Sequence, residues 1–424
     1  MEKYLVMIDL PNLPYSGMIP LSLILMEILQ CVFTIPFAWQ AIVIICGHFR
    51  KEKEPEGDIG KKNRFAVLIC AKDEERVVGT LLDSLSKQAY PREYVQIYLF
   101  ADHCSDNTAQ VGRKHGNIRV YERNTGLTRG KGDVLAWGID RVLREHGDEI
   151  DAFVFFDADN VADKDFLSQM NRRLNSGENV IQGNRLAGKP FRTIVTKGFA
   201  IYWMLYDFGL LYQRQKLGLS SFVTGTGFVA KKTVLSEGWK TKTITEDVEF
   251  AIQCCLKGER VAYCHKAAFF DEQPSQFSVM VKQLSRWCTG NYQILAAYMN
   301  RLFFWFKGEK KLMRLDNLML LLVGPANCAM AITMVITTFM IAREAPMLVA
   351  LAGAMVYLAQ TLISIFVLTF FYKADMRTFF PACFFMPVFF GVFGICSIIG
   401  LICPKRRWEK IEHEGISEAL EEKV

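Results

Sequence analysis

Ala152-Phe-Val-Phe-Phe-Asp-Ala-Asp159 is the stretch of sequence that decides the expected fold. Its run of apolar residues is typical of a parallel strand that is buried on both faces of its sheet. Two carboxylates, Asp157 and Asp159, follow the run at once. In parallel sheets, ligands bind beyond the carboxyl ends of the strands. The stretch therefore predicts a buried strand over 152–156 with acidic side chains at its functional end.

Three further apolar runs have the length of strands, namely Phe65–Ala71, Tyr94–Ala101 and Ile118–Tyr121. Helical patterns separate them; after the first run, Val77 and Leu81 begin an apolar helix face. Alternating strands and helices form a parallel sheet that is covered by helices. We therefore expect an α/β domain built on a doubly wound sheet.

Polar residues follow three of these strands, at Asp73-Glu74, Asp102 and Asp157-Ala-Asp159. Lys131 lies in a loop that is punctuated by glycines, Arg129-Gly-Lys-Gly132. A single acidic residue after a strand is commonly only a helix cap. Three acidic sites along one edge of a sheet, beside a lysine, are harder to explain by capping and indicate a binding site.

The Asp157-Ala-Asp159 pair has the chemistry of a site for a divalent ion. Mg²⁺ and Mn²⁺ prefer hard oxygen ligands, and Mg²⁺ is usually held by one or two carboxylates together with substrate phosphates. Asp-x-Asp alone occurs by chance in many proteins. Its position directly after a predicted strand makes the metal interpretation more specific.

Two later motifs each allow two interpretations. Thr245-Glu-Asp247 precedes a predicted helix, so it is either an N-terminal cap with dipole-stabilising carboxylates or a site in which Asp247 acts as a general base. Gln283, Arg286 and Trp287 lie within about one helical turn and are able to face one site. A Trp packed in a core, with an Arg that reaches to the surface, explains that motif equally well.

The composition indicates a membrane protein. Hydrophobic residues make up 51% of the 424 residues, and the mean hydropathy is +0.15. Such a composition excludes a disordered chain. The net charge of +6 is not gathered into one basic stripe, so we expect no nucleic-acid partner.

The cysteines indicate neither zinc nor disulfides. The 12 of them form no CxxC pair and no Cys/His cluster with the spacing of zinc ligands. Several lie in apolar runs, where a free cysteine behaves as a small hydrophobic residue. We expect reduced thiols.

The apolar residues are concentrated at the two ends of the chain. Met18–Cys46 is long enough for one transmembrane helix. Three C-terminal stretches, Leu318–Ala342, Met347–Tyr372 and Thr378–Cys403, predict about three more. Prolines within these stretches, such as Pro325, are able to break a helix.

Basic residues give the expected orientation. Arg50-Lys-Glu-Lys53 marks the side that follows the first helix as cytoplasmic. Three crossings after a cytoplasmic domain would leave the tail outside, whereas Lys405-Arg-Arg407 favours the inside. A re-entrant or interfacial stretch would remove this conflict.

A segment before the C-terminal helices is amphipathic. Ile294–Lys307 carries Tyr298, Leu302, Phe303 and Phe306 at near-helical spacing. This pattern is typical of a helix that lies in the membrane interface, and a core helix of the soluble domain fits nearly as well.

We accordingly divide the chain into five parts. They are an N-terminal segment with one transmembrane helix (1–50), a cytosolic α/β domain (51–293), an amphipathic interfacial region (294–313), about three transmembrane helices (314–404) and a short charged tail (405–424).

The motifs resemble those of the membrane-integrated inverting glycosyltransferases of family 2, which include cellulose, mannan, hyaluronan and poly-N-acetylglucosamine synthases. The resemblance covers roughly residues 63–295 and implies a GT-A-type fold with Mg²⁺ or Mn²⁺ as cofactor. It rests on four motifs in this order: Asp102, Asp157-Ala-Asp159, Thr245-Glu-Asp247 and Gln283-x-x-Arg286-Trp287.

The resemblance also implies where the donor and the metal bind. Asp159, with Asp157, would hold the metal ion. The residues that would bind the UDP-sugar donor are Glu74, Asp102, Lys131, Asp157 and Arg286.

The resemblance further implies the catalytic and acceptor residues. Asp247 would be the general base, with Glu246 beside it. The residues that would contact the acceptor are Gln283, Trp287, Thr226 and Gly227, the last two in a loop whose glycines allow close backbone approach to a sugar.

The function that the resemblance implies is processive transfer from a UDP-sugar to a growing β-linked polysaccharide at the plasma membrane, with the catalytic domain in the cytoplasm. Passage of the glycan through the bilayer is compatible with this function. The expected partners are the bilayer and an accessory membrane subunit or a second copy of the chain. Two alternatives stay open, namely transfer of a single sugar to a membrane lipid and, more remotely, a transporter or channel.

Overall fold

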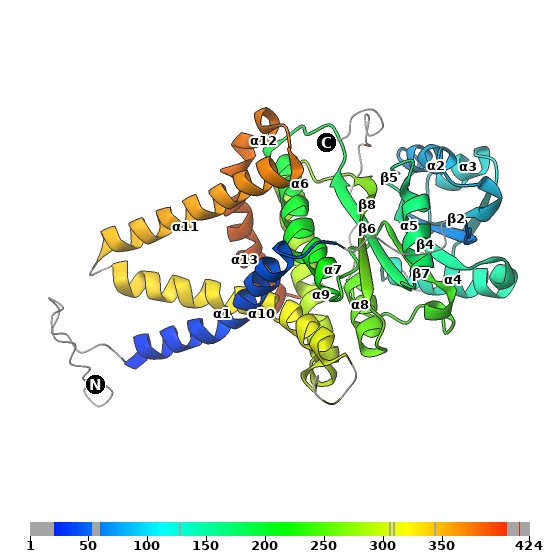
Figure 1. Cartoon of the computed structure of the whole chain (residues 1–424). Coiled ribbons are helices and arrows are strands. Elements are labelled where there is room, and N and C mark those ends of the chain that lie inside the picture. Colours follow the sequence, from blue (N-terminus) through cyan, green and yellow to red (C-terminus); the bar gives the residue numbers. More distant parts are fainter. Residues whose placement is uncertain are drawn as a thin grey trace.

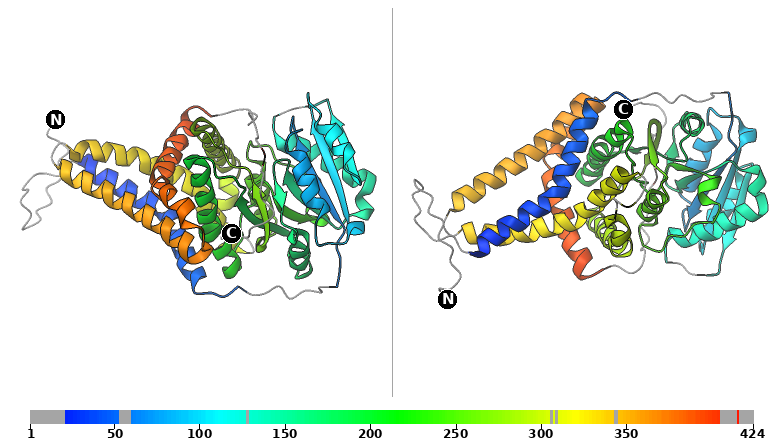
Figure 2. Two further views of the ribbon diagram at one scale, coloured as in Figure 1. Left: turned by 90° about the horizontal axis from the view of Figure 1, so that it is seen from above. Right: turned by 60° about the horizontal axis from the view of Figure 1, so that its bottom comes forward.

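The computed structural model describes residues 21–52, 60–126, 129–304, 307, 310–342, 345–404 and 415. It has two adjoining parts, an α/β part and a set of long apolar helices that project away from it (Figures 1 and 2). The charged tail at 405–424 lies outside the described residues except for Gly415.

The α/β part is built on one sheet. Within the described residues the sheet has eight strands, in the order β3-β2-β1-β4-β7-β6-β8-β5. The strands are β1 (Phe65–Ala71), β2 (Val95–Asp102), β3 (Ile118–Arg123), β4 (Ala152–Asp157), β5 (Val161–Ala162), β6 (Val180–Ala187), β7 (Phe228–Lys231) and β8 (Val261–Asp271).

The first half of the sheet is parallel and the second half is mixed. β1 pairs in parallel with both β2 and β4, and β2 pairs in parallel with β3. β7 is antiparallel to β4 and β6, whereas β6 and β8 are parallel. The carboxyl ends of β1, β2 and β4 therefore meet at one edge, as the strand–helix alternation predicts.

Alternate residues of the strands pack into two different hydrophobic clusters, one on each face of the sheet. Phe153 and Phe155 of β4 belong to one hydrophobic cluster, and Val154 and Phe156 belong to another. Helices that cover the sheet are α2 (Val78–Ser86), α3 (Thr108–Lys114), α4 (Lys131–His146), α5 (Phe166–Asn175) and α8 (Glu246–Leu256), with short 3₁₀ turns η1 (Arg92–Tyr94), η2 (Gly147–Glu149) and η4 (Lys232–Leu235). Because α4 contributes to the first cluster and α2 to the second, the sheet is doubly wound, which confirms the predicted fold class.

A helical segment between β6 and β7 lies against the long helices. It consists of α6 (Ile194–Tyr206), the π-helix η3 (Asp207–Tyr212) and α7 (Gln213–Leu217). α6 contacts α12, and α7 contacts α1. This segment therefore joins the α/β part to the apolar helices.

Among the residues that the structure describes, three helices are long and apolar enough to cross a membrane. They are α1 (Leu21–His48), α10 (Lys311–Ala342) and α11 (Pro346–Val367), which continues as the π-helix η6 (Leu368–Tyr372). α12 (Met376–Cys383) and α13 (Met386–Ile402) form a further apolar pair that is bent by 50° at their junction. Pro325 lies inside α10 without ending it, whereas the third predicted C-terminal stretch is broken.

α9 (Phe277–Phe303) is one continuous helix. The boundary predicted between 293 and 294 therefore does not coincide with a helix end. Tyr298 and Leu302 of the predicted amphipathic segment pack against the core of the α/β part, whereas Phe303 is exposed. Phe306 lies outside the described residues.

A buried ion pair ties the two parts together. The Arg214 guanidinium in α7 donates two hydrogen bonds of 2.9 Å to the Asp316 carboxylate in α10, and both side chains are fully buried. From α1, Gln40 accepts a hydrogen bond from Arg214, and the Trp39 indole donates one of 2.8 Å to Asp316. Removing one partner of such a pair leaves an uncompensated buried charge, so the pair fixes how these helices fit together.

Candidate active site

One large cavity opens at the carboxyl edge of β1, β2 and β4. It has a volume of about 1280 Å³ and continues between α9, α10 and α13. Thr226 and Gly227 are not among its lining residues. The predicted site residues that line it are Glu74, Asp102, Lys131, Asp157, Asp159, Glu246, Asp247, Gln283, Arg286 and Trp287.

Asp102 ends β2 and is held by its neighbours. One carboxylate oxygen accepts a hydrogen bond of 2.6 Å from the Arg123 guanidinium and lies 2.9 Å from Nδ1 of His103. Asp102 and Arg123 are both buried, so the charge of each is neutralised by the other. The pair gives this end of the cavity a carboxylate in a fixed orientation.

Lys131 and Asp157 form an ion pair in the wall of the cavity. Lys131 begins α4, Asp157 ends β4, and the Lys131 ammonium also donates a hydrogen bond of 2.8 Å to the Gly225 carbonyl. Burial of Lys131 favours its neutral form, but Asp157 and nearby carboxylates outweigh this effect and raise its pKa. The ammonium group is therefore charged at neutral pH.

Glu246 and Asp247 occupy the first turn of α8, where the helix dipole favours negative charge. Burial, and after it the negative charge of the adjacent Asp247, raise the pKa of Glu246 to about 7. Burial also raises the pKa of Asp247, against the effects of the Val248 N–H and Arg286. The two neighbouring carboxyls are thus unequal, and Glu246 holds a proton at a higher pH than an ordinary glutamate does.

Gly225 brings Asp247 close to the Lys131–Asp157 pair. A Cβ on Gly225 would lie 3.2 Å from Oδ2 of Asp247, and the φ of Gly225 is +91°. The carbonyl of the same residue binds Lys131. One loop residue therefore lies beside both Asp247, the predicted base, and Lys131, which is predicted to bind the donor.

Trp287 stands in an aromatic wall. Its ring stacks on Tyr202 with a centroid distance of 6.0 Å and meets Trp203 edge-on at 5.7 Å. α9 carries Gln283 and Arg286 on the cavity side of the same turn. The arrangement offers a flat apolar face beside hydrogen-bonding groups, which is the combination that sugar rings require.

Comparison with known sequences identifies the family. The sequence model described as Glycosyltransferase like family 2 matches residues 63–290, which is more than half of the chain. The chain is a family 2 glycosyltransferase. The predicted resemblance is thereby confirmed at the level of the family.

Named relatives of this glycosyltransferase match only part of their own length. The probable glycosyltransferase YdaM of Bacillus subtilis is 23% identical over 67% of this chain and 68% of that protein. The beta-monoglucosyldiacylglycerol synthase of Trichormus variabilis is 24% identical over 58% of this chain and 52% of that protein. This chain therefore spans about half the length of that synthase.

A solved structure shares the architecture. The mannosyltransferase PcManGT from Pyrobaculum calidifontis, in complex with GDP-Man and Mn²⁺, has a TM-score of 0.61 at 14% identity, covering 88% of this chain and 99% of that chain. The likeness shows a common fold. It confirms the predicted GT-A fold and extends to the apolar helices.

Thr226 and Gly227 lie behind the cavity wall of the glycosyltransferase. The Thr226 hydroxyl is buried and accepts a hydrogen bond of 2.9 Å from the Asp157 N–H. A Cβ on Gly227 would lie 2.1 Å from the Phe269 ring, so this position requires glycine. In the structure these residues support the Asp157 loop, and their contact with an acceptor stays a prediction.

Sequence reasoning missed the residue that fixes the Asp157–Asp159 loop. Asn160 accepts a hydrogen bond of 3.0 Å from the Asp157 N–H and donates one of 2.7 Å to Asp271. The buried Asp271 also accepts a hydrogen bond of 3.0 Å from Arg185. The only local signal was the position of Asn160 directly after Asp159.

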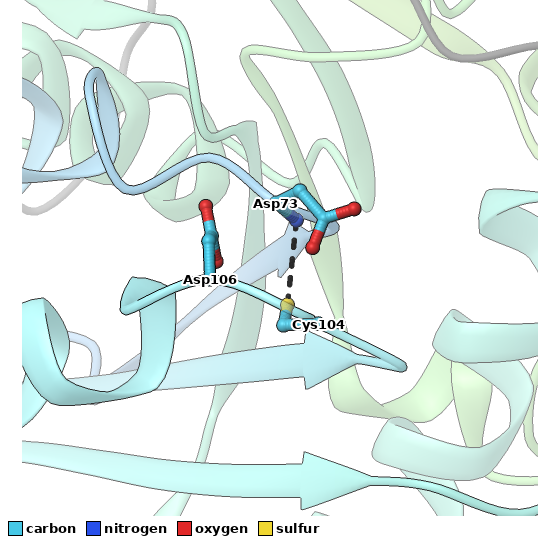
Figure 3. Close-up of side chains that lie close together, drawn as sticks. All are labelled: Asp73, Cys104 and Asp106. Carbon is cyan, nitrogen blue, oxygen red and sulfur yellow. Dashed lines mark hydrogen bonds between the residues drawn. The ribbon is translucent and has the colours of Figure 1, made fainter.

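A different group of side chains has the spacing of metal ligands. Asp73, Cys104 and Asp106 converge between the loops that follow β1 and β2 (Figure 3). Their carboxylates already accept backbone hydrogen bonds, including 2.6 Å from Ser105 N to Asp73 and 3.0 Å from Thr108 N to Asp106. Burial raises the pKa of Cys104, which keeps its thiol protonated and a poor ligand. These three side chains are therefore better suited to holding the two loops together than to binding Mg²⁺ or Mn²⁺.

Proposed function

We propose that this family 2 glycosyltransferase transfers a sugar from a UDP-sugar to a growing β-linked saccharide at the cytoplasmic face of a membrane. The observation that carries the proposal is the position of Gly225, whose carbonyl binds Lys131 and on which a Cβ would lie 3.2 Å from Oδ2 of Asp247. It brings the acidic group at the start of α8 close to the donor side of the same cavity. In a direct displacement the base must reach the acceptor hydroxyl while that hydroxyl lies next to the donor sugar, so the base and the donor site must be neighbours.

In the proposed reaction Asp247 takes the proton of an acceptor hydroxyl. The hydroxyl oxygen attacks the anomeric carbon from the face opposite UDP, a new C–O bond forms, and the bond to the diphosphate oxygen breaks. The configuration at the anomeric carbon is inverted, so an α-linked donor gives a β-linked product. Lys131 and Arg286 supply positive charge near the departing diphosphate.

Asp157 and Asp159 suit a divalent ion. Both line the cavity at the end of β4, and a carboxylate pair with substrate phosphates is a usual environment for Mg²⁺. We therefore propose Asp159, with Asp157, as the residues that hold Mg²⁺ or Mn²⁺. A bound ion would neutralise negative charge on the diphosphate. Lys131 would keep Asp157 in place, because it is already paired with that carboxylate.

A lipid acceptor is the second candidate. Its support is the similarity to a protein named beta-monoglucosyldiacylglycerol synthase. The extension of the cavity between α9, α10 and α13 is compatible with either acceptor, because it leads from Trp287 toward helices that are apolar enough to span a membrane. The two candidates share the donor site and the base.

A test of the base replaces Asp247 with asparagine. Asp247→Asn keeps the size of the side chain but removes the proton acceptor, so we expect transfer to fall by at least about 10²-fold while UDP affinity changes little. Transfer is measured with a panel of radiolabelled UDP-sugars and UDP binding by calorimetry. Asp140→Asn, on the exposed side of α4, is the matched control and should behave as wild type. Equal losses of UDP affinity and of transfer rate would contradict the role as base.

A further inference from the structure

Asp271 is a buried carboxylate at the end of β8, and its two oxygens bind different parts of the cavity wall. Oδ1 accepts a hydrogen bond of 2.7 Å from the Asn160 amide. Oδ2 accepts one of 3.0 Å from the Arg185 guanidinium and one of 2.7 Å from the Gln273 amide. A single carboxylate therefore connects the loop after β4, the strand β6 and the loop after β8.

On the Oδ1 side, Asn160 holds the loop that carries the two proposed metal ligands. Its amide oxygen accepts a hydrogen bond of 3.0 Å from the Asp157 N–H and another from the Thr226 hydroxyl. Its amide nitrogen donates to Asp271 and, at 3.5 Å, to the Asp159 carboxylate. Because a carboxylate only accepts, these partners allow one orientation of the Asn160 amide.

On the Oδ2 side, two contacts connect Asp271 to Trp203 in the aromatic wall. The Arg185 guanidinium lies over the Trp203 ring, 4.0 Å from its centroid. The Trp203 indole donates a hydrogen bond of 3.0 Å to Oε1 of Gln273. Trp203 in turn meets Trp287 edge-on. The acceptor side of the cavity is thus connected to the same carboxylate as the loop that follows β4.

The geometry of a carboxylate makes this connection stiff. Its two oxygens are fixed relative to each other, so a displacement of the groups on Oδ2 also moves Oδ1 and the Asn160 amide. Hydrogen bonds to a charged carboxylate are stronger than those between neutral groups, and burial protects them from water. Groups that orient metal ligands from behind commonly change metal affinity by about 10- to 100-fold.

We propose that Asp271 is a positioning residue that connects the Asp157–Asp159 loop to Trp203, so that the aromatic wall affects how tightly the loop holds its metal ion. Such a coupling is reciprocal, so a bound metal ion and UDP also favour the arrangement of the wall that receives the acceptor. This inference rests on the proposed function, from which it takes the metal site.

The test measures how much Mn²⁺ increases the affinity for UDP. Purified full-length protein in detergent is titrated with UDP by calorimetry, once with a fixed concentration of Mn²⁺ and once with EDTA in place of the metal. We call the ratio of the two dissociation constants the metal enhancement. It reports on the metal site without requiring transfer. Because it is taken within one preparation, it does not depend on the folded fraction.

Single variants interrupt the connection at different points. Asn160→Ala and Asp271→Asn should each reduce the metal enhancement by about tenfold. Trp203→Phe keeps an aromatic ring but removes the hydrogen bond to Gln273, so we expect a reduction of about threefold. Gln273→Met removes the same bond from its other side and should have the same effect. A residue that only stabilises the fold would not alter this ratio.

A double variant identifies the route. In Asn160→Ala/Trp203→Phe the connection is already interrupted at Asn160, so the metal enhancement should equal that of Asn160→Ala alone. Trp39→Phe is the matched control. It removes an indole hydrogen bond of 2.8 Å to another buried carboxylate, Asp316, between α1 and α10, and should keep the wild-type metal enhancement.

Three outcomes would overturn the inference and leave the proposed function standing. They are an unchanged metal enhancement in Asp271→Asn and Trp203→Phe, additive losses in the double variant, and a loss in Trp39→Phe as large as that in Trp203→Phe. Asp159→Asn tests the proposed metal site separately and should reduce the metal enhancement to about one. A wild type without metal enhancement, or an Asp159→Asn variant that keeps it, would reject the proposed metal site and the inference with it.

Discussion

Glu246 and Asp247 are neighbouring carboxyls in one buried site, and a single negative charge is easier to accommodate there than two. Burial raises the pKa of both carboxyls. The negative charge of Asp247 adds to this effect on Glu246, whose pKa is about 7. Groups whose environments separate their pKa values commonly divide acid and base roles. We therefore propose Asp247 as the proton acceptor, beside Glu246, which keeps a proton up to a pH of about 7.

The raised pKa of Glu246 predicts a pH-dependent stability. Its folded-state value of about 7 exceeds the ordinary value of 4.5, so the folded protein binds more protons than the unfolded chain in this interval. The stability that this group contributes is complete below pH 4.5 and is lost as the pH rises through 7. Glu246→Gln, which stays neutral, should gain thermal stability relative to wild type over this interval. The unfolding temperatures of Glu246→Gln and wild type are compared without donor across this pH range. A difference between them that stays constant from pH 4 to 8 would contradict the raised pKa of Glu246.

The residues whose places in the fold the sequence predicted best belong to local motifs. Asp157 and Asp159 come at the end of a recognisable strand, and Asp247 lies in the first turn of a recognisable helix. Asn160 and Asp271 were missed as a pair because they are 111 positions apart, and no local pattern records a contact of that range. Thr226 was predicted to face the acceptor, but burial of its side chain depends on packing that sequence periodicity does not reveal.

At the scale of elements, the buried strands were easy to predict and the helix ends were not. β1 has the bounds Phe65–Ala71 that its apolar run predicts, because a strand buried on both faces leaves no polar positions to blur its limits. The continuity of α9 through 293 and 294 was not predicted, since an amphipathic pattern begins there while the backbone continues as one helix.

The loop before β7 gives a prediction of its own. Gly225 has a left-handed φ of +91°, and its missing side chain leaves room for Asp247. Gly225→Ala would strain the loop and press a Cβ against Oδ2 of Asp247, so we expect transfer to fall about tenfold or more with a smaller effect on UDP binding.

Gly218→Ala, at another left-handed glycine that has open space around it, is the control. It should impose similar backbone strain without affecting transfer. If both variants lost the same activity, strain in the loop rather than the position of Asp247 would explain the result.

The positions of the tail and of α13 in the whole molecule indicate how the chain crosses the membrane. The Gly415 N–H donates a hydrogen bond of 3.0 Å to Glu272, so this point of the tail lies beside the α/β part. α13 packs mainly against α9 and does not extend along the far ends of α10 and α11 (Figure 1). Both observations favour a bent, re-entrant α12–α13 pair. That arrangement would place Lys405–Arg407 on the cytoplasmic side and would remove the charge conflict.

Reporter fusions test this topology. We expect a C-terminal fusion to be fluorescent with green fluorescent protein and inactive with alkaline phosphatase, because this topology would place the tail in the cytoplasm. A fusion after Ala345, between α10 and α11, should show the opposite behaviour and serves as the internal control. Active alkaline phosphatase at the C-terminus would mean that the α12–α13 pair crosses the membrane.

The most direct test of the central claim is the anomeric configuration of the product. Detergent-purified protein is given Mn²⁺ and isotope-labelled α-linked UDP-sugars in turn, and the new linkage is examined by nuclear magnetic resonance. A single displacement at the cavity shared by Asp157, Asp159 and Asp247 predicts a β-linkage that disappears in Asp247→Asn. An α-linked product, or a β-linkage that Asp247→Asn still forms at the wild-type rate, would contradict the account.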